Sequence, residues 1–445
     1  MTKKHFAVIG AGAGGLCAAK NLFARGLDVT IFEAGSTVGG LWVYENDSGL
    51  SPTYRSLHIN SEARVSSFID FQFPKGTSLY PDHREMHRYF QNYAAHFNLT
   101  GKIKFKSKVK AITPEGGQWK IETEAGATFL FDGVIVATGH QSVPRHAPEI
   151  ESFSGNYIHA HAYRTPESFA GKRVLVIGPG NSGVDIAADI CTQTEQTDLS
   201  ARSPVLIMPR LMFGVPNSRV LGALEKPWLP WWIKIKIRTW LTRVFHGRME
   251  QWGFRTPTTR THPISHPTLI SHIAWKRIKV RPGIRSIKDK TVTYVDGSLA
   301  DYDAIIGATG YVTHLPFLDV RQSPMMGHKF RLYNRVINPD LPGLFFIGFF
   351  DVTGGSNIRM MDEQAEYISA VASGAVTLPD VRDMDKAIEE DFAWYAALFP
   401  DTPRYANELD PVRYRKNLSR DYERCSVARI VYPAPGYTLH EEVTP

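Results

Sequence analysis

A glycine-rich turn near the start of the chain restricts the fold more than any other feature. The segment Gly10–Gly15 reads G-x-G-x-x-G and directly follows the apolar run Phe6–Ile9. A stretch with helical character and a second apolar run, Val29–Phe32, come next. The first glycine permits a tight turn, the second lets a pyrophosphate approach the backbone, and the third lets a helix pack closely on a strand. The order strand, turn, helix, strand therefore predicts a βαβ unit that binds a dinucleotide.

Glu33 stands at the end of the second predicted strand and indicates which dinucleotide the first turn binds. An acidic side chain at this place accepts hydrogen bonds from ribose hydroxyls. The same carboxylate repels a 2′-phosphate, because both groups are negatively charged. We therefore expect the first turn to bind FAD or NAD rather than NADP.

A second G-x-G-x-x-G, Gly178–Gly183, follows the apolar run Val174–Ile177 and precedes the helical stretch Val184–Ile190. The next predicted strand carries Ser200 and Arg202 and has no acidic residue at its end. A guanidinium with a small hydroxyl beside it suits the 2′-phosphate of NADPH. The second turn is therefore expected to prefer NADPH, the alternative being that Arg202 is a solvated loop cation.

Two copies of Ala-Thr-Gly, at 137–139 and 308–310, each follow an apolar run. The repeat suggests two matched crossings between domains, with the second nucleotide unit inserted into the first. We predict an α/β fold with two Rossmann-like dinucleotide-binding domains, the NADP domain inserted into the FAD domain. The expected limits are 1–150 for the first part of the FAD domain, 151–305 for the NADP domain, and 306–445 for the second part with a C-terminal extension.

Two more helices are predicted, at 84–97 and from about 362 to 373, because apolar residues recur there with helical spacing. The aromatic residues of the first are interpreted as core and not as a binding stripe.

The three cysteines, Cys17, Cys191 and Cys425, stand far apart and form no C-x-x-C. A disulfide framework, a structural zinc site and a dithiol redox centre are therefore not predicted. The histidines at 262, 266 and 272 form a loose trio, which we interpret as surface or capping residues, so no metal site is expected. Electrons passed from NADPH to a flavin would then leave for oxygen or a diffusible acceptor.

Composition sets limits on partners and location. The net charge of +7 is modest for 445 residues, and the chain has no long run of like charges. We expect anionic ligands such as phosphates and no nucleic acid. No secretory signal and no apolar run of about 18 residues are present, so no transmembrane segment is predicted. The sparse cysteines favour a reducing cytoplasm, and a homodimer is left open.

The segment Phe153–Tyr163, just ahead of the second glycine turn, reads F-x-G-x-x-x-H-x-x-x-Y. It resembles the fingerprint of the class B flavoprotein monooxygenases, and its terminal Tyr163 resembles the flavin-containing monooxygenases among them. The resemblance runs over roughly residues 5 to 400. It is also carried by Gly39–Trp42, Tyr54–Ser56, Ile59–Ser61, Gly180–Gly183, Asp185–Ala187, Ala308–Tyr311 and Glu363–Ala365.

The resemblance implies a reaction and a set of catalytic residues. In this family NADPH reduces FAD, and oxygen adds to the reduced flavin to give a C4a-hydroperoxyflavin. One oxygen atom then passes to a soft nucleophile, nitrogen or sulfur, of a small molecule. Asn60 is expected to be the active-site amide, the alternative being a turn-capping residue. His159 and Tyr163 are expected to act at the domain hinge, with direct proton transfer by His159 as the alternative.

The residues expected to bind FAD or NADP lie at the two glycine turns and in the segments that resemble the family. They are Gly10, Gly12, Ala13, Gly14, Gly15, Glu33, Gly40, Leu41, Trp42, Asn60, Ser61, Val109, Thr138, Gly139, Gly178, Gly180, Asn181, Ser182, Gly183, Asp185, Ser200, Arg202, Ala308, Thr309, Gly310 and Gln364.

Three other functions stay open at this point. The first is Baeyer–Villiger oxygenation of a ketone, in whose enzymes Trp more often stands at the place of Tyr163. The second is an NADPH oxidase or reductase with another acceptor. The third is a non-catalytic nucleotide sensor, which the two intact glycine turns disfavour.

The Trp- and Lys-rich segment 226–245 has no assigned secondary structure. Alternation of apolar and basic residues over Ile233–Arg238 is closer to the period of a strand than to that of a helix. The segment is interpreted as an interface helix, a lid over a substrate tunnel or a membrane-surface patch. A buried packing element or a subunit contact is the plainer interpretation.

Overall fold

The chain folds into two compact units. The computed structural model describes residues 3–222, 224, 228–262, 264–326, 329–352, 355–399 and 407–427. Within these residues, unit 1 comprises 3–51, 63–140 and 313–427, and unit 2 comprises 52–62 and 141–312. Unit 2 is thus an insertion in unit 1, and the predicted fold class is confirmed. The predicted domain limits at 150 and 305 stay predictions.

Unit 1 is built on a five-stranded sheet in which all neighbouring strands run parallel. Such strands are buried on both faces, which explains their continuous apolar runs. In sheet order the strands are β24 (Leu344–Phe346), β7 (Gly133–Val136), β1 (His5–Ile9), β2 (Asp28–Phe32) and β3 (Ile103–Lys104). An antiparallel meander lies between β3 and β7 in the sequence: β4 (Val109–Glu115), β5 (Gln118–Thr123) and β6 (Thr128–Phe131).

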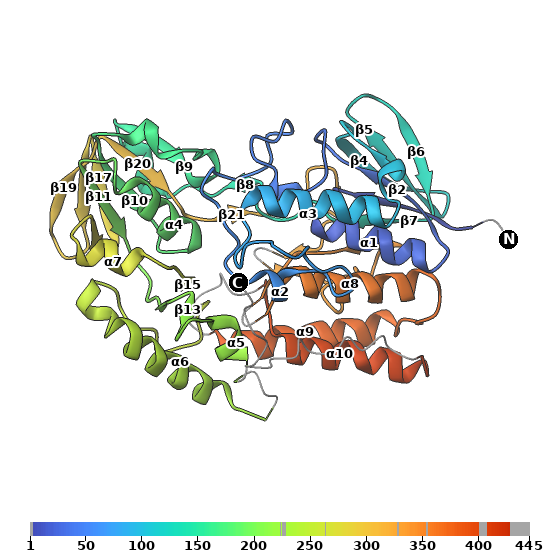
Figure 1. Cartoon of the computed structure of the whole chain (residues 1–445). Helices are drawn as coiled ribbons and strands as arrows, with labels where there is room; N and C mark the ends of the chain where they lie inside the picture. The colour runs from blue at the N-terminus through green and yellow to red at the C-terminus, as the bar shows by residue number, and fades with distance from the viewer. Residues whose placement is uncertain are drawn as a thin grey trace. The chain divides into compact units, whose positions relative to one another are not determined.

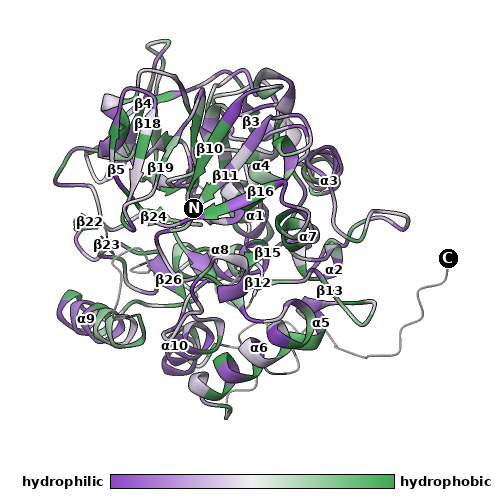
Figure 2. Ribbon diagram, turned by 90° about the vertical axis from the view of Figure 1, so that its left-hand side faces the viewer, coloured by the Kyte–Doolittle hydropathy of each residue, from purple (hydrophilic) through white to green (hydrophobic). Residues whose placement is uncertain are grey.

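Unit 2 repeats this plan. Its parallel sheet has the order β16 (Ile278–Arg281), β11 (Gln196–Ser200), β10 (Arg173–Ile177), β20 (Ala304–Gly307) and β9 (Asn156–His159). Its meander lies between β16 and β20 in the sequence, as that of unit 1 lies between β3 and β7, and consists of β17 (Ile284–Lys288), β18 (Thr291–Tyr294) and β19 (Leu299–Asp301). β10 takes the central place in its sheet that β1 has in the sheet of unit 1. Figure 2 colours most of β10 as hydrophobic. The two units are therefore two versions of one Rossmann-like arrangement.

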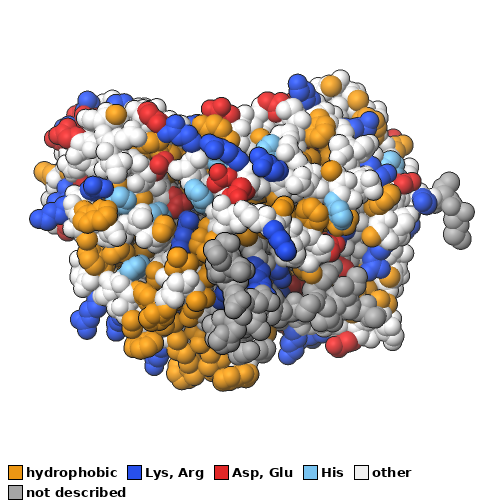
Figure 3. Space-filling model, in the orientation of Figure 1, with side chains coloured by type: hydrophobic (Ala, Val, Ile, Leu, Met, Phe, Trp, Pro, Cys, Tyr) orange, Lys and Arg blue, Asp and Glu red, His pale blue; other side chains and the backbone are white. Residues whose placement is uncertain are grey.

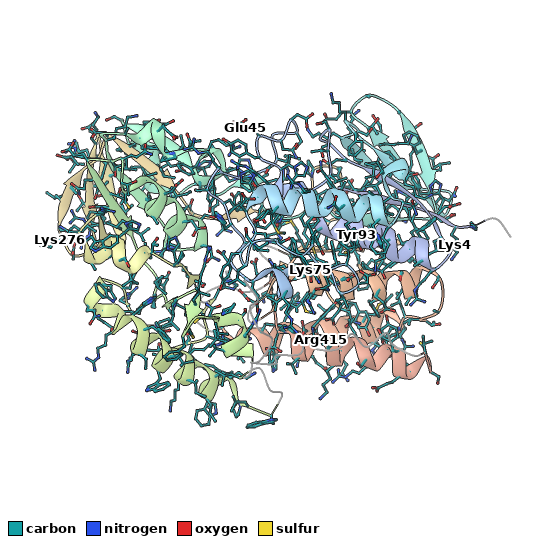
Figure 4. The ribbon with its side chains drawn as sticks, in the orientation of Figure 1. Lys4, Glu45, Lys75, Tyr93, Lys276 and Arg415 are labelled. Carbon is teal, nitrogen blue, oxygen red and sulfur yellow. The ribbon has the colours of Figure 1, made fainter. Side chains whose placement is uncertain are left out.

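Unit 1 has six α-helices in its described part (Figure 1). They are α1 (Ala13–Ala24), α2 (Ala63–Ser66), α3 (His83–His96), α8 (Asn357–Ala372), α9 (Val381–Leu398) and α10 (Pro411–Arg424). The predicted core face of α3 is confirmed: Met86, Tyr89, Phe90 and Tyr93 are at most 1% exposed. Tyr93, labelled in Figure 4, packs 4.1 Å from the ring of Phe68.

Two ion pairs attach helix α8 to helices α1 and α10 within unit 1. Lys20 of α1 lies 3.6 Å from the fully buried carboxylate of Asp362 on α8. Arg415 of α10, labelled in Figure 4, lies 2.7 Å from the buried Glu363, which is also on α8.

Helix α8 begins at Asn357, five residues earlier than the sequence pattern predicts. Ser356 caps the helix by accepting a hydrogen bond from the backbone N–H of Arg359.

Unit 2 has four helices in its described part and several short strand pairs. The helices are α4 (Asn181–Ile190), α5 (Asn217–Gly222), α6 (Trp231–His246) and α7 (Leu269–Ala274). The short pairs are β8 (Val143–Pro144) with β21 (Tyr311–Val312), β12 (Ile207–Met208) with β15 (Ile264–Ser265), and β13 (Leu211–Met212) with β14 (Val215–Pro216). In unit 1 the short pairs are β22 (Met325–Met326) with β23 (Lys329–Phe330), and β25 (Asp351–Val352) with β26 (Glu408–Leu409). None of the helices in the described part of the chain is both long and apolar enough to span a bilayer.

Candidate functional site

The first glycine turn lies between β1 and α1 and cannot accept larger residues. Gly10 has a φ of +104°, and a Cβ on it would lie 2.8 Å from the carbonyl oxygen of Ala137. A Cβ on Gly15 would lie 1.9 Å from the carbonyl oxygen of Gly10. Both distances are shorter than a non-bonded contact allows, so the turn needs glycine at each place. The steric roles expected of these two glycines are present in the structure.

The second glycine turn, between β10 and α4, has the same construction. Gly178 has a φ of +107°, and its Cβ would lie 2.5 Å from the carbonyl oxygen of Ala308. A Cβ on Gly183 would lie 1.9 Å from the carbonyl oxygen of Gly178. Ala308 follows β20 as Ala137 follows β7, so the repeated Ala-Thr-Gly marks the strand end that closes each turn.

Helices α1 and α4 both begin without a side-chain cap. Their N-caps are Gly12 and Gly180, and neither helix has an acidic residue in its first turn. In contrast, α3, α8, α9 and α10 are each capped by an Asp or Ser side chain. The first backbone N–H groups of α1 and α4 are thus left for another acceptor, and the positive end of a helix favours a phosphate. A Cβ added to Gly180 would meet no other atom within 4 Å in the part of the chain that the structure describes.

Glu33 ends β2 beside the first turn, as expected. Its carboxylate accepts hydrogen bonds from the backbone N–H groups of Ala11, at 2.7 Å, and Gly35, at 2.8 Å. Burial raises the pKa of Glu33, while these two hydrogen bonds act against the rise. A carboxylate has about four acceptor positions, so Glu33 can also accept from a ribose hydroxyl.

A further turn, carrying Gly40, Leu41 and Trp42, packs against the first glycine turn. The backbone N–H of Gly39 donates to the carbonyl of Ala11 at 3.0 Å. A Cβ on Gly40 would lie 3.0 Å from the Cα of Gly12. The structure thus brings together two predicted cofactor-binding segments that are separated in the sequence.

Gln364 presents a buried hydrogen-bond donor in unit 1. Its side chain is fully buried, and its Oε1 accepts from the backbone N–H of Gly348 at 3.0 Å. Its Nε2 has no hydrogen-bond partner among the described residues. Such a donor is costly unless a ligand or water accepts from it, and a flavin carbonyl fits that need. Thr138 and Gly139 follow β7 in the same unit, whereas Val109 is a core residue at the start of β4.

The predicted 2′-phosphate residues lie at the carboxyl end of β11. Ser200 is the last residue of this strand, and its hydroxyl donates to the carbonyl of Pro282 at 2.8 Å. Arg202 is exposed two residues further on. Ligands of parallel sheets bind at this edge, so the position is consistent with the expectation. The neighbouring Arg281 pairs instead with the buried Asp198 at 2.6 Å.

The fingerprint residues His159 and Tyr163 are both buried in unit 2. Tyr163 is fully buried and donates to Asp189 of α4 at 2.6 Å. The ring of His159 lies 5.4 Å from that of Tyr311 and 5.6 Å from that of His146. Burial, followed by the nearby His146, lowers the pKa of His159 to about 4. His159 is therefore neutral at physiological pH.

We expect His159 to make the folded state sensitive to acid. Its pKa is about 4 in the folded chain and 6.5 in an unfolded one, so the unfolded state binds more protons between these values. The free energy of unfolding therefore falls as the pH drops from 6.5 towards 4. Urea unfolding across this range should show a smaller fall for His159→Gln than for the wild type. Parallel curves for the two proteins would show that His159 does not contribute.

Asn60 is held by a residue that the sequence did not indicate. Arg210 donates from Nη2 to Asn60 Oδ1 at 3.0 Å. A guanidinium only donates, so the amide oxygen of Asn60 must face it and the amide NH₂ faces elsewhere. Ser61, the next residue, also belongs by its contacts to unit 2.

Asp185 of α4 anchors the segment that carries Asn60. Tyr54 donates to Asp185 at 2.9 Å, and Nε2 of His266 lies 3.3 Å from the same carboxylate. Nδ1 of His266 accepts from the backbone of Leu269, so the ring proton is on Nε2 and points to Asp185. Burial lowers the pKa of His266 to about 3 and raises that of Asp185 to about 6.

The acidic residues of α4 are recognisable from their spacing in the sequence. Asp189 stands four residues after Asp185, so one face of α4 carries two acids at helical spacing. Ser56 donates to Asp189 at 2.8 Å, which fixes the same segment to the same helix. Arg210 and His266 had no such signal. The capping interpretation of His266 agrees with its hydrogen bond to the start of α7.

Comparison with known proteins decides the family. The model of the flavin-binding monooxygenase-like family matches residues 3–424. The chain belongs to this family. Flavin-containing monooxygenase 5 of Homo sapiens is 32% identical over 419 residues, which cover 88% of this chain and 78% of that protein. This monooxygenase is therefore an enzyme that binds a flavin, in a family whose members depend on NADPH.

Solved structures show the same fold. The S-allyl-L-cysteine S-oxygenase of Allium sativum has a TM-score of 0.72 and 24% identity, over 97% of this chain and 90% of that one. Cyclohexanone monooxygenase bound to ε-caprolactone has a TM-score of 0.70 and 17% identity, over 95% and 98% of the two chains. The flavin monooxygenase thus shares its fold with an S-oxygenase and with a cyclohexanone monooxygenase.

Proposed function

We propose that this flavin monooxygenase uses NADPH and O2 to transfer one oxygen atom to a nitrogen or sulfur nucleophile of a small molecule. FAD binds at the turn Gly10–Gly15, and NADPH binds at the turn Gly178–Gly183. The observation that carries this assignment is the presence of two glycine turns of the same construction, each followed by a helix without a side-chain cap. A dinucleotide pyrophosphate fits both.

The residues of unit 1 suit FAD. The N–H groups at the start of α1 bind the pyrophosphate, and Glu33 accepts from the adenosine ribose. The buried Nε2 of Gln364 donates to the flavin ring. When bound, the flavin accepts hydride, activates oxygen and supplies the oxygen atom, while the protein binds, orients and shields it.

Arg202 gives the second site its preference for NADPH. Its exposed guanidinium pairs with the 2′-phosphate, and a charge-assisted pair of this kind contributes about 1.5–3 kcal/mol. Arg202→Ala should therefore raise the KM for NADPH by roughly tenfold or more, while the KM for NADH is unchanged. Steady-state kinetics with both nucleotides measure this, and Arg285→Ala, an exposed arginine of β17, serves as the control. Equal effects on NADPH and NADH would contradict the assignment.

Asn60 acts as the active-site amide, and Arg210 is its positioning residue. Because Arg210 occupies the amide oxygen, the NH₂ group of Asn60 is the part that can donate to the nicotinamide cofactor or to the oxygen being transferred. Preorganised donors of this kind stabilise charge that develops during the reaction.

His159 and Tyr163 act at the crossing between the two units rather than in proton transfer. His159 contacts His146 and Tyr311, which lie close in sequence to two of the four places where the chain passes from one unit to the other. Its neutral ring, with a pKa of about 4, is a weak proton donor and acceptor at neutral pH. Tyr163 anchors the fingerprint to α4 through Asp189.

Nitrogen or sulfur is the favoured acceptor of the oxygen atom for two reasons. The related proteins are named flavin-containing monooxygenases, and one related human protein is named as N-oxide-forming. The likeness to cyclohexanone monooxygenase is 17% in sequence and concerns the fold. Tyr163 at the end of the fingerprint also favours oxygenation of nitrogen or sulfur over Baeyer–Villiger oxygenation of a ketone.

Rapid mixing tests the proposal. The flavin-loaded protein is reduced by NADPH without oxygen and then mixed with oxygenated buffer containing methyl p-tolyl sulfide, N,N-dimethylaniline or cyclohexanone. We expect the sulfide or the amine to speed the return of oxidised flavin and to yield sulfoxide or N-oxide, and cyclohexanone to do neither. Reoxidation at one rate in every mixture, with hydrogen peroxide as the product, would overturn it in favour of an NADPH oxidase. A lactone formed from cyclohexanone would favour the Baeyer–Villiger function.

A further inference from the structure

Helix α6 exposes large aromatic side chains to solvent and buries two polar ones. The strand-like alternation of its sequence was misleading, because the segment is helical from Trp231 to His246. Its two buried residues are Arg238 and Thr242. Trp240, in contrast, is 62% exposed. A helix on a water-soluble surface normally buries its apolar stripe and exposes its charges.

The exposed residues of α6 form one ridge. Trp232, Lys236, Trp240 and Val244 follow each other at intervals of four residues, so they share one face of the helix. All four side chains are exposed, and the ammonium of Lys236 lies 5.2 Å from the ring centre of Trp232.

Neighbouring residues widen the ridge into a patch. Trp228 is 76% exposed just before the helix, and Phe213 is 79% exposed and lies 4.8 Å from the ring of Phe245 on α6. Figure 3 shows hydrophobic side chains gathered over α6 at the lower edge of the view. We call Phe213, Trp228, Trp231, Trp232, Trp240 and Val244 the α6 patch.

The charge around the α6 patch has one sign. Between Trp228 and Met249 the sequence has five Lys and Arg residues and no Asp or Glu. Of these, Lys236, Arg243 and Arg248 are exposed. Tryptophan beside Lys and Arg is the composition that suits the boundary between lipid head groups and acyl chains. The aromatic rings enter the boundary, while the basic groups reach the phosphates.

We infer that the α6 patch docks this enzyme on the surface of a membrane that contains anionic lipids. The helix lies in the plane of the surface and inserts its outer ridge without crossing the bilayer. Of the earlier interpretations of segment 226–245, this is the membrane-surface patch; residues 226 and 227 lie outside the described residues. A second copy of the chain is the less favoured occupant, because a symmetric contact through this patch would bring its basic residues against each other.

Vesicle flotation of the flavin-loaded full-length protein tests the inference. The probes are vesicles of phosphatidylcholine alone and of phosphatidylcholine with an equal part of phosphatidylglycerol. We expect binding to the anionic vesicles, weakened by salt, and little binding to the neutral ones. Trp232→Ala with Trp240→Ala should lower the binding constant by roughly tenfold for each ring removed. Lys236→Gln with Arg243→Gln should lower it by roughly fivefold for each charge.

Matched controls separate the patch from general effects. Trp275 is also 62% exposed, on another part of unit 2, and Trp275→Ala should bind as the wild type does. Lys279→Gln with Lys288→Gln removes two exposed charges elsewhere in the unit and should have a smaller effect than the pair on α6. NADPH consumption should be the same in all variants, which shows that they fold.

Two results would overturn the inference. One is the absence of binding to anionic vesicles, or equal binding by the wild type and the double tryptophan variant. The other is a dimer, seen by analytical ultracentrifugation without lipid, that the same double variant converts to a monomer, because the patch would then be a contact between copies.

Discussion

Gly183→Ala should leave the flavin bound but greatly slow its reduction by NADPH, whereas Gly15→Ala should yield a protein without flavin. Both glycines meet the carbonyl oxygen of the first glycine in their turn, and an added Cβ would lie 1.9 Å from it in each case. The turn must open to relieve this contact, and the N–H groups of the following helix then move away from the phosphates. The identical distances make the two substitutions a matched pair.

The bound flavin is measured by its visible absorbance, and its reduction by anaerobic mixing with NADPH. We expect the rate of reduction to fall by roughly a hundredfold or more in Gly183→Ala, since the binding energy of the pyrophosphate is lost. Circular dichroism checks that each variant is folded. Loss of flavin in Gly183→Ala, with retention in Gly15→Ala, would reverse the proposed assignment of the two turns.

Gly180→Ala separates a ligand effect from a folding effect at the second turn. An added Cβ meets no atom of the described residues within 4 Å, so the stability of the protein should stay close to that of the wild type. If NADPH lies against this N-cap, the methyl group still weakens its binding. A variant with unchanged stability and unchanged KM for NADPH would contradict the placement of the nucleotide.

Asn60→Ala should retain reduction of the flavin and lose oxygen transfer. Loss of one preorganised donor lowers turnover by roughly a hundredfold or more in sites of this kind. Sulfoxide formed for each NADPH consumed is the measured quantity, and we expect hydrogen peroxide to take its place. Unchanged product formation would show that Asn60 is a turn residue only.

Arg210 should act through Asn60. Arg210→Met removes the donor to Asn60 Oδ1, so the amide is free to turn. We expect the same change in product ratio as in Asn60→Ala, though smaller, and partial recovery in Arg210→Lys. The double variant of Asn60→Ala and Arg210→Met should be no worse than Asn60→Ala alone, because a positioning residue has no effect without the group it positions. Asn417→Ala, on α10 of unit 1, is the control for an asparagine outside the site.

The sequence predicted the features that depend on local geometry. Few residue types fit a tight turn between a parallel strand and a helix. The two turns could therefore be predicted from the spacing of their glycines, Gly10 and Gly15 in the first and Gly178 and Gly183 in the second. The repeated Ala-Thr-Gly could also be recognised in the sequence. Only the structure shows the reason for the repeat, which is that each alanine carbonyl lies close to the first glycine of a turn.

Features that depend on distant contacts could not be predicted. Asn60 meets Arg210, 150 positions away, through a region with no recognisable motif. Residues 52–62 stand early in the sequence, yet their contacts are with unit 2 through Tyr54, Ser56 and α4. Helix α6 was not predicted for another reason. An amphipathic helix is recognised by apolar residues that recur on one buried face. In α6, Trp232 and Trp240 are exposed whereas Arg238 and Thr242 are buried.

This enzyme is proposed to transfer one oxygen atom from O2 to its substrate. Isotope labelling identifies the source of that atom in the product. The flavin-loaded protein is supplied with NADPH, ¹⁸O₂ and methyl p-tolyl sulfide, and the sulfoxide is analysed by mass spectrometry. We expect one labelled oxygen atom in each sulfoxide, the second in water, and one NADPH consumed for each product. Consumption of NADPH with all the oxygen recovered as hydrogen peroxide, for this sulfide and for a panel of other thioethers and tertiary amines, would contradict it.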